Sequence, residues 1–331
     1  MLLIHAFVAW ACAPAPPPGV RVDVLDEAAL IVFDADSRTE HFIRRAHFDT
    51  SAPGAVDFGF LVPTPSVPTL AEAPADLFDR LARETAPDVI YDVERTFSLS
   101  WTGALFMPRS DDKAAPRGVQ VIALQRVGAW DAAILQADDA RALRTWLTDH
   151  GYPVAANLEA WLAGYVGTGW ALTAFKLAKD ANGTDVDLAP VRLTFTTDRP
   201  FYPYREPAPE GPPRDGDRAL RLWLVAPGVY KGLVGGAPWV AERSSAAPLR
   251  DLQLLDGVVD PPVGAWVSAW TDTQSPRPGG AELTFQAAPA VELRPPPTRE
   301  VRTEDVPIPV DLLAGVGLTG LLLRRRFTRR A

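Results

Sequence analysis

Residues 119–197 constrain the fold most, because six secondary-structure elements follow one another there with clear starts and stops. Apolar residues recur there in the two patterns typical of strands and of amphipathic helices. Asp138 is the expected N-cap of the first helix, and Gly151 is expected to end it. An Asn182-Gly183 turn is expected between the last two strands. The six expected elements are strands over 119–127 and 130–135, helices over 139–150 and 157–166, and strands over 170–177 and 191–197.

The segments on both sides of this stretch are dominated by strand patterns. Residues 20–63 alternate apolar and polar side chains in four runs separated by turn residues, which favours an antiparallel meander. A third helix is expected to begin at Pro74 and end before Pro87, and a strand is expected over 89–101. The patterns therefore predict an α+β fold: an antiparallel β-rich core with about three helices, and a second, mostly β part. The strands expected in the second part cover 220–225, 238–242, 249–255, 265–271 and 281–287.

Proline-rich segments mark the expected domain boundaries. The chain has 33 prolines among 331 residues, and they are dense over residues 201–217, where charged residues are also frequent. Such a composition is typical of a linker or a long surface loop. The expected parts are a signal peptide and proline-rich spacer over 1–18, an α+β domain over 19–205, a β-rich second part over 206–294, a proline-rich stalk over 295–309, and a membrane helix with an arginine-rich tail over 310–331.

The amino terminus has the pattern of an export signal. Residues 1–11 are apolar, about as long as the hydrophobic region of a signal peptide and too short to span a bilayer. Small residues around Cys12 are typical of a cleavage site, although no basic residue precedes the apolar run. A buried first strand is the alternative. Cys12 is also a candidate lipidation site, for which Trp10 is a poor neighbour, and as the single cysteine it excludes an internal disulfide.

The carboxyl terminus has the pattern of a membrane tail. Asp311 is the expected cap of an apolar helix over residues 312–323, which is about 18 Å long against a hydrocarbon core of about 30 Å. Extending the helix back to Val306 makes a span feasible, and an amphipathic helix is the alternative. Arginines that follow an apolar helix favour a cytoplasmic end, with the body in the periplasm or outside the cell. The candidate membrane residues are Leu312, Leu313, Leu321, Leu322, Leu323, Arg324, Arg325 and Arg326.

Charge and motifs exclude several classes of function. The net charge of −8 and the scattered basic residues argue against nucleic-acid binding. The motifs of serine hydrolases, phosphate loops and zinc proteases are missing, so no cofactor, metal ligand or catalytic residue is assigned. His41 and His47 lie about 20 Å apart on one expected strand and cannot share a metal, and His150 fits a helix C-terminus. Residues 180–187 resemble part of a calcium loop, but the Asn182-Gly183 turn explains them as well.

Four aromatic residues are candidates for a binding surface. They form two groups, one in a proline-containing segment and one with a spacing of four residues on an expected strand. Exposed rings of this kind stack on glycans or peptides, which would make an envelope glycan or protein the partner. The alternative is that the rings pack between the two expected parts, since aromatic residues dominate buried interfaces. The four residues are Tyr202, Tyr204, Trp266 and Trp270.

Several short motifs carry a family resemblance: residues 58–68 (FGFLVPTPSVP), 127–131 (VGAWD), Leu143 with the Trp146-Leu147 pair, 150–152 (HGY) and 191–195 (VRLTF). With these motifs, residues 20–205 resemble a bacterial family known as domain of unknown function 2330 (DUF2330). The resemblance implies that the protein is exported, and it implies no activity because none is attached to the family. Family members often have a Cys- and Gly-rich insertion near residues 102–118, which this chain lacks. Residues 306–310 (VPIPV) with the tail resemble a bacterial carboxy-terminal sorting signal, which implies processing by a sortase-like membrane enzyme.

Together these features predict a protein of the cell envelope. The expected function is that of an exported, membrane-anchored, non-enzymatic module that binds or supports another envelope component. The alternative is an extracytoplasmic hydrolase whose carboxylates come together only in the fold, for example from Asp131, Asp138 or Glu94.

Overall fold

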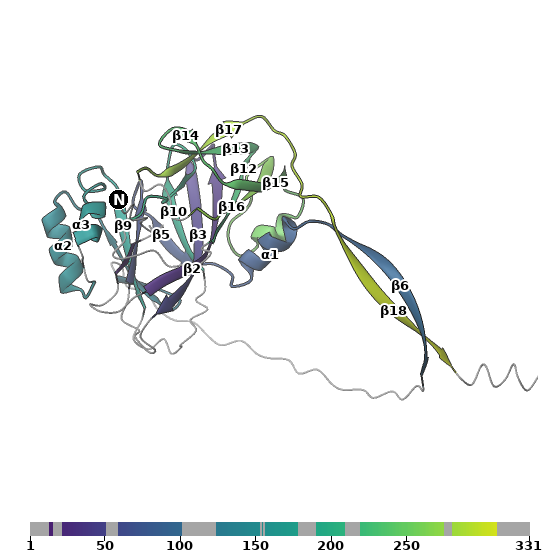
Figure 1. Cartoon of the computed structure of the whole chain (residues 1–331). Helices are drawn as coiled ribbons and strands as arrows, with labels where there is room; N and C mark the ends of the chain where they lie inside the picture. The colour runs from purple at the N-terminus through teal and green to yellow at the C-terminus, as the bar shows by residue number, and fades with distance from the viewer. Residues whose placement is uncertain are drawn as a thin grey trace, which may run out of the picture. The chain divides into compact units, whose positions relative to one another are not determined.

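The computed structural model describes residues 13–15, 22–50, 59–100, 124–152, 154, 156–177, 190–208, 219–274 and 280–309 (Figure 1). The side chains of residues 13–15, 22–26, 46–50, 93–100 and 303–309 are outside this description. The chain divides into two compact units. Residues 1–86 and 120–295 form the first unit, and residues 87–119 and 296–331 form the second.

A seven-stranded sheet is the centre of the first unit. Alternating apolar residues form its long strands, and strands β2 and β12 pair in parallel while all other neighbours are antiparallel. The order across the sheet is β15 (Glu242–Pro248), β16 (Ala265–Asp272), β12 (Ala219–Pro227), β2 (Val22–Asp34), β3 (Thr39–Thr50), β10 (Val191–Thr196) and β5 (Thr69–Glu72). Strands from both sides of the expected boundary near residue 205 therefore share one sheet.

Two smaller sheets and three helices complete the first unit. A five-stranded sheet has the order β1 (Ala13–Ala15), β4 (Gly59–Thr64), β9 (Ala171–Leu177), β8 (Trp130–Leu135) and β7 (Leu124–Val127). A four-stranded sheet has the order β11 (Phe201–Tyr202), β17 (Leu283–Ala288), β13 (Val229–Val234) and β14 (Ala237–Pro238). The helices are α1 (Leu77–Glu84), α2 (Ala140–Asp149) and α3 (Ala156–Leu162), with a 3-10 helix η1 at Leu252–Leu255.

Three apolar cores hold these layers together. The first lies between the seven-stranded sheet and the two smaller sheets, where Phe42 of β3 and Phe175 of β9 are fully buried. The second lies between the other face of the seven-stranded sheet and α1 with η1, and contains Ile43. The third joins the five-stranded sheet to α2 and α3, as Figure 1 shows. Each large apolar side chain buried in these cores contributes about 1.5–3 kcal/mol.

The second unit contains a two-stranded parallel ribbon. Strand β6 (Val89–Ser100) pairs with β18 (Thr298–Pro309) over the full length of both strands. Twelve residues in each strand make the ribbon about 40 Å long at the usual rise of a parallel strand. The strand expected over 89–101 is therefore present, and the segment expected to be an extended stalk is extended and paired.

The observed fold confirms the expected α+β class, with several antiparallel sheets and three helices among the described residues. The strand over 130–135 has the bounds that the sequence predicts. Several expectations are wrong. Residues 22–34 form the single strand β2, where two of the four runs were expected, and β4 joins β9 in another sheet, so residues 20–63 do not form the expected meander. The N-cap of α2 is Asp139, whose carboxylate accepts hydrogen bonds from the backbone of Arg141 and Ala142. Residues 252–255 form a 3-10 helix instead of a strand.

Another wrong expectation is the hairpin between residues 170–177 and 191–197. Strand β9 pairs with β4 and β8 in the five-stranded sheet, whereas β10 pairs with β3 and β5 in the seven-stranded sheet. The Asn182-Gly183 turn itself lies outside the described residues. The chain therefore crosses between two sheets where a local turn signal predicted that it would fold back.

Both expected membrane signals lie largely outside the described part of the chain. Only residues 13–15 of the expected amino-terminal signal and spacer are described. Residues 13–15, which were expected to belong to a proline-rich spacer, form the edge strand β1 and pair with Gly59–Leu61 of β4. Residues 1–12 and 310–331 lie outside the description. Among the described residues, no helix is long and apolar enough to span a membrane.

Candidate functional site

A row of polar side chains crosses β3 and β10 on the face of the seven-stranded sheet that carries α1. We call it the polar row; it comprises His41, Ser66, Arg192, Thr194 and Thr196. Thr194 lies directly opposite His41 in the antiparallel ladder, and Arg192 lies opposite Ile43. Residues that lie opposite each other share a face of the sheet, and Ile43 belongs to the core under α1. The polar row therefore continues this face beyond the part that the helix covers.

His41 is held by a hydroxyl in the middle of the polar row. Its Nδ1 lies 2.9 Å from Oγ1 of Thr194, and its ring is half-buried. Desolvation lowers the pKa of His41, the nearby guanidinium of Arg192 lowers it further, and the carboxylate of Asp34 opposes the shift. The imidazole is therefore neutral at neutral pH and presents one donor and one acceptor nitrogen.

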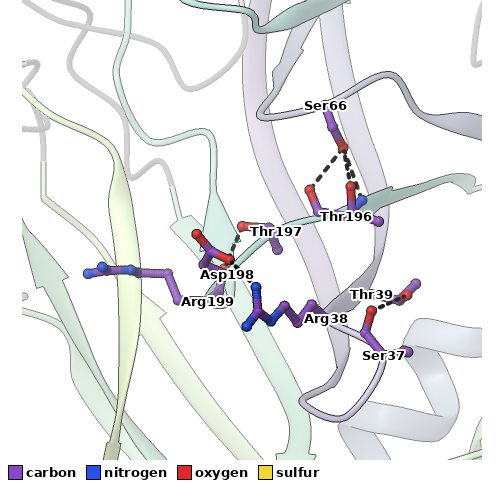
Figure 2. Close-up of polar contacts among 8 residues, drawn as sticks. All are labelled: Ser37, Arg38, Thr39, Ser66, Thr196, Thr197, Asp198 and Arg199. Carbon is purple, nitrogen blue, oxygen red and sulfur yellow. Dashed lines mark hydrogen bonds and ion pairs between the residues drawn. The ribbon is translucent and has the colours of Figure 1, made fainter.

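Ser66 closes the end of the polar row (Figure 2). Its hydroxyl donates to the carbonyl oxygen of Thr196 at 2.9 Å and accepts from the amide of Thr196 at 3.0 Å. Strand β5 pairs with β10 only as far as Thr69, so the Ser66 side chain takes the place of the next backbone partner. Thr64 Oγ1 in turn donates to the carbonyl of Ser66 at 2.8 Å. The Pro-rich motif over residues 63–68 thus works as a structural connector from β4 to β5.

Figure 2 also shows the turn beside the polar row. Arg38 has a φ of 52° in the turn between β2 and β3, and its carbonyl accepts from Thr197 N at 2.9 Å. The guanidinium of Arg38 lies 3.2 Å from the carboxylate of Asp198, and both side chains are exposed. Thr197 Oγ1 donates to the carbonyl of Arg199 at 2.9 Å. This turn fixes the end of β10, and its exposed ion pair contributes little stability.

The polar row contains a histidine beside a hydroxyl, and the carboxylate nearest to the histidine is bonded elsewhere. A histidine beside a hydroxyl is one half of a base and nucleophile arrangement. A third group must orient the ring in such a site, but the carboxylate of Asp34 accepts from Ser37 Oγ at 2.7 Å and from Asp36 N at 2.9 Å. These hydrogen bonds lower the pKa of Asp34 and leave its carboxylate committed to the turn. The row presents the hydroxyls of Thr194 and Thr196 and the imidazole of His41 on a sheet face, whereas the Arg192 guanidinium donates to the carbonyl oxygen of Val258.

A second polar group lies inside the first core and surrounds the extended segment 201–206. Backbone and tyrosine donors of this segment are each held by a carboxylate from a different part of the chain. Phe201 N donates to Glu40 Oε2 at 2.8 Å. Tyr204 OH donates to Asp272 Oδ2 at 2.8 Å. Arg205 N donates to Glu282 Oε2 at 2.9 Å, and Tyr165 OH donates to the other oxygen of Glu282.

Burial perturbs two of these acids. Desolvation raises the pKa of Glu40 well above its ordinary value, and the hydrogen bond from Phe201 only partly opposes this. Desolvation also raises the pKa of Glu282, against the hydrogen bonds from Arg205 and Tyr165. Raised carboxyl pKa values also occur in general acids, but here each carboxylate accepts from the protein's own backbone. Their chemistry is that of structural acceptors.

A buried ion pair lies in the same core. Arg44 Nη2 is 2.9 Å from Glu27 Oε1, and the two side chains are 2% and 0% exposed. The guanidinium carbon of Arg44 also lies 4.9 Å from the centre of the Phe60 ring, which adds a cation–π contact between the seven-stranded and five-stranded sheets. The pair joins β2 to β3 and helps hold the two sheets together.

The aromatic candidates lie mainly in the core. Tyr202 and Tyr204 are fully buried, Trp270 is buried, and Trp266 is partly buried. Tyr204 and Trp270 each pack against Trp239, with ring centres 6.1 Å apart in both cases. Tyr202, Tyr204 and Trp270 therefore pack in the core of the first unit, and their rings are not exposed for stacking.

The remaining candidates take separate places. His150 caps the C-terminus of α2, where its ring stacks on Trp146 with centres 3.9 Å apart. Asp131 on β8 and Asp138 before α2 are exposed. The side chain of Glu94, and all of Cys12 and of the tail candidates from Leu312 to Arg326, lie outside the description. Within the described residues, no group of three or more His, Cys, Asp or Glu side chains could hold a metal ion.

Neither polar group forms a sequence motif, because the residues of each group lie far apart along the chain. One signal was available: Glu40, Phe42 and Arg44 share one phase of an expected strand. Charged residues in phase with a core phenylalanine indicate buried partners. A second signal of the same kind is the alternation of Arg192, Thr194 and Thr196 along β10, which indicates a polar face of that strand.

Comparisons with known proteins give one match. Residues 9–222, well over half of the chain, match a family described as "Uncharacterized protein conserved in bacteria (DUF2330)". No curated protein matches, and no solved structure matches.

Proposed function

The chain belongs to the DUF2330 family of uncharacterised bacterial proteins, and on this premise we propose that it is an exported, membrane-anchored, non-enzymatic module of the cell envelope. Its body binds or supports another envelope component, and its tail anchors it in the cytoplasmic membrane. The polar row is the face that we assign to binding a polar partner, such as a glycan or an extended peptide.

The observation that carries this proposal is the use of the buried acids. Glu40, Asp272 and Glu282 all accept hydrogen bonds from residues 201–206 or from a tyrosine beside them. A hydrolase that relied on carboxylates brought together by the fold would need at least one of them to face a substrate. In this chain those acids stabilise the extended segment 201–206 in the core. The arrangement favours a rigid scaffold over a catalytic centre.

The anchoring part rests on the order of segments along the chain. Strand β18 ends at Pro309, directly before the apolar residues 312–323 and the arginine cluster. Arginines on that side favour a cytoplasmic end of the tail. The resemblance of residues 306–310 to a sorting signal makes processing of the tail by a sortase-like membrane enzyme the alternative to a plain membrane anchor.

Protease treatment of intact spheroplasts tests the topology. We expect the body to be degraded and the tail to be protected. Replacing five arginines, 324–326 and 329–330, with asparagine should weaken retention and scramble the orientation while the body stays folded. Lysed spheroplasts serve as the control for protease activity. A body that stays protected until lysis would refute export and anchoring together. Mass spectrometry of the mature chain reports both ends, including whether Cys12 is acylated.

A binding assay tests whether the polar row binds an envelope component. Isolated peptidoglycan sacculi and membrane vesicles from the same cells are the probes. We expect the double variant Thr194→Val/Thr196→Val to reduce retention of the protein on one of these probes several-fold. Thr148→Val, an exposed threonine on α2, is the matched control and should bind like the native chain. Equal retention of the double variant and the native chain on both probes would remove the polar row from the proposal.

A further inference from the structure

Within the described residues β18 pairs only with β6, so its other edge has no strand partner there, and the backbone groups along that edge follow a defined pattern. Thr298 N donates to the carbonyl of Asp88 at 2.9 Å, and Thr298 is paired with Val89. In a parallel ladder, alternate residues of a strand bond to the same neighbour. The backbone groups of Thr298, Glu300 and Arg302 therefore point toward β6. Those of Arg299 and Val301 point away from it.

This edge is the kind that pairs with another strand. A two-stranded ribbon alone is marginally stable in water, and an unpaired edge is a template for strand addition. Val301 is 62% exposed on β18, and Tyr91 is 54% exposed on β6. Backbone donors and acceptors along the edge thus accompany exposed apolar side chains.

The charges along β18 favour one register of pairing with a second copy of the same strand. When β18 is placed antiparallel to a copy of itself with the two-fold axis at Val301, Glu300 of each chain lies opposite Arg302 of the other. Val301 then forms a hydrogen-bonded pair with its own copy, as its outward-pointing backbone requires. Glu300 and Arg302 form the closer, non-hydrogen-bonded pairs, in which opposite charges stabilise the sheet.

The neighbouring registers are disfavoured by the same charges. An axis at Glu300 places two glutamates opposite each other, and an axis at Arg302 places two arginines opposite each other. Like charges directly opposite each other destabilise an antiparallel pair. Of the three registers centred within residues 300–302, only the one at Val301 pairs opposite charges without also placing like charges opposite each other.

We propose that the chain forms a homodimer through β18, in which two ribbons join edge to edge into a four-stranded sheet with the order β6, β18, β18 and β6. The partner is a second copy of this chain, and the contact is a two-fold antiparallel pairing centred on Val301. This dimer is independent of the polar row and of what the body binds.

Disulfide trapping of the full chain in its own membranes tests the register. In a hydrogen-bonded antiparallel pair the two Cα atoms are about 5.5 Å apart, which lies within the range of about 4.4–6.8 Å that a disulfide needs. Val301→Cys should therefore give a cross-linked species of twice the monomer mass on mild oxidation. Tyr91→Cys is the matched control, because β6 and its copy would be three strand spacings, or about 14 Å, apart. The native chain, which keeps Cys12, measures the background.

Charge exchange separates a specific contact from damage to the ribbon. Added to Val301→Cys, Glu300→Arg should lower the cross-linked yield several-fold, because arginines then face each other. The exchange Glu300→Arg/Arg302→Glu should restore the yield, since opposite charges face each other again. Background yield from Val301→Cys, or equal yields from Val301→Cys and Tyr91→Cys, would overturn the proposal. So would an exchange variant that behaves like the single charge reversal.

Discussion

Breaking the buried ion pair between Glu27 and Arg44 should be among the most destabilising single changes in the first unit. The two side chains are almost fully buried and 2.9 Å apart. Arg44→Met keeps much of the volume of the side chain but leaves the carboxylate of Glu27 without this cation. Removing one partner of a buried pair costs about 3–5 kcal/mol. Loss of the contact with the Phe60 ring adds about 0.5–2 kcal/mol.

The double variant Glu27→Leu/Arg44→Met should cost much less than the sum of the two single changes. Both charges are then absent, and replacing a buried pair by apolar residues of similar volume is often nearly neutral. The difference between the sum and the double variant should therefore exceed about 2 kcal/mol, beyond the error of additivity. The reason is that each single variant leaves one buried charge without its partner.

Urea denaturation of the full-length protein in detergent, followed by tryptophan fluorescence, measures these free energies. The control is Arg38→Met/Asp198→Asn, which removes an ion pair whose side chains are 71% and 84% exposed. This control should change the free energy of unfolding by less than about 1 kcal/mol. A loss below about 1 kcal/mol for Arg44→Met, or single effects that simply add, would refute the assignment of Glu27 and Arg44 as a charged buried pair.

Three further changes test single features of the fold by the same denaturation assay. Burial raises the folded-state pKa of Glu40 above its ordinary 4.5. The contribution of Glu40 to stability is therefore complete below about pH 4.5 and is lost as the pH rises through the folded pKa. Glu40→Gln should flatten this fall in stability, and an unchanged pH profile would contradict the prediction. Asp139→Ala should cost about 1 kcal/mol while Asp138→Ala costs little, because only Asp139 caps α2; equal effects would reject this cap. In Gly59→Ala the new Cβ would lie 2.5 Å from the carbonyl oxygen of Phe175, so a loss of about 1–3 kcal/mol is expected, and a neutral result would contradict that close approach.

The local elements could be predicted because their signals lie within a few residues. Strand β8 has the bounds that its apolar run predicts, and helix α1 buries the residues that its period predicts, with Leu77, Phe78 and Leu81 facing the core. The α+β class follows from the same patterns. The cap of α2 was misplaced by one residue, because Asp138 and Asp139 are both good N-caps and only the backbone geometry decides between them.

The partners of these elements could not be predicted in the same way. Strands β9 and β10 follow each other across an Asn-Gly turn signal but belong to different sheets. The central position of β12 beside β2 depends on pairing residues that are nearly 200 positions apart, such as Leu220 with Glu27. A local pattern specifies that a segment is a strand and which face is apolar. It contains no information about which distant edge the strand will join.

By itself, the sequence determined most of the strands and the three helices, the apolar faces of the helices, and the resemblance to an uncharacterised bacterial family. Only the tertiary structure decided which polar groups meet. The hydrogen bond between His41 and Thr194 joins residues 153 positions apart, and the one between Glu40 and Phe201 joins residues 161 positions apart. Secondary structure is encoded by short periods along the chain. A polar group is assembled by strand pairing and core packing, which depend on the whole chain at once.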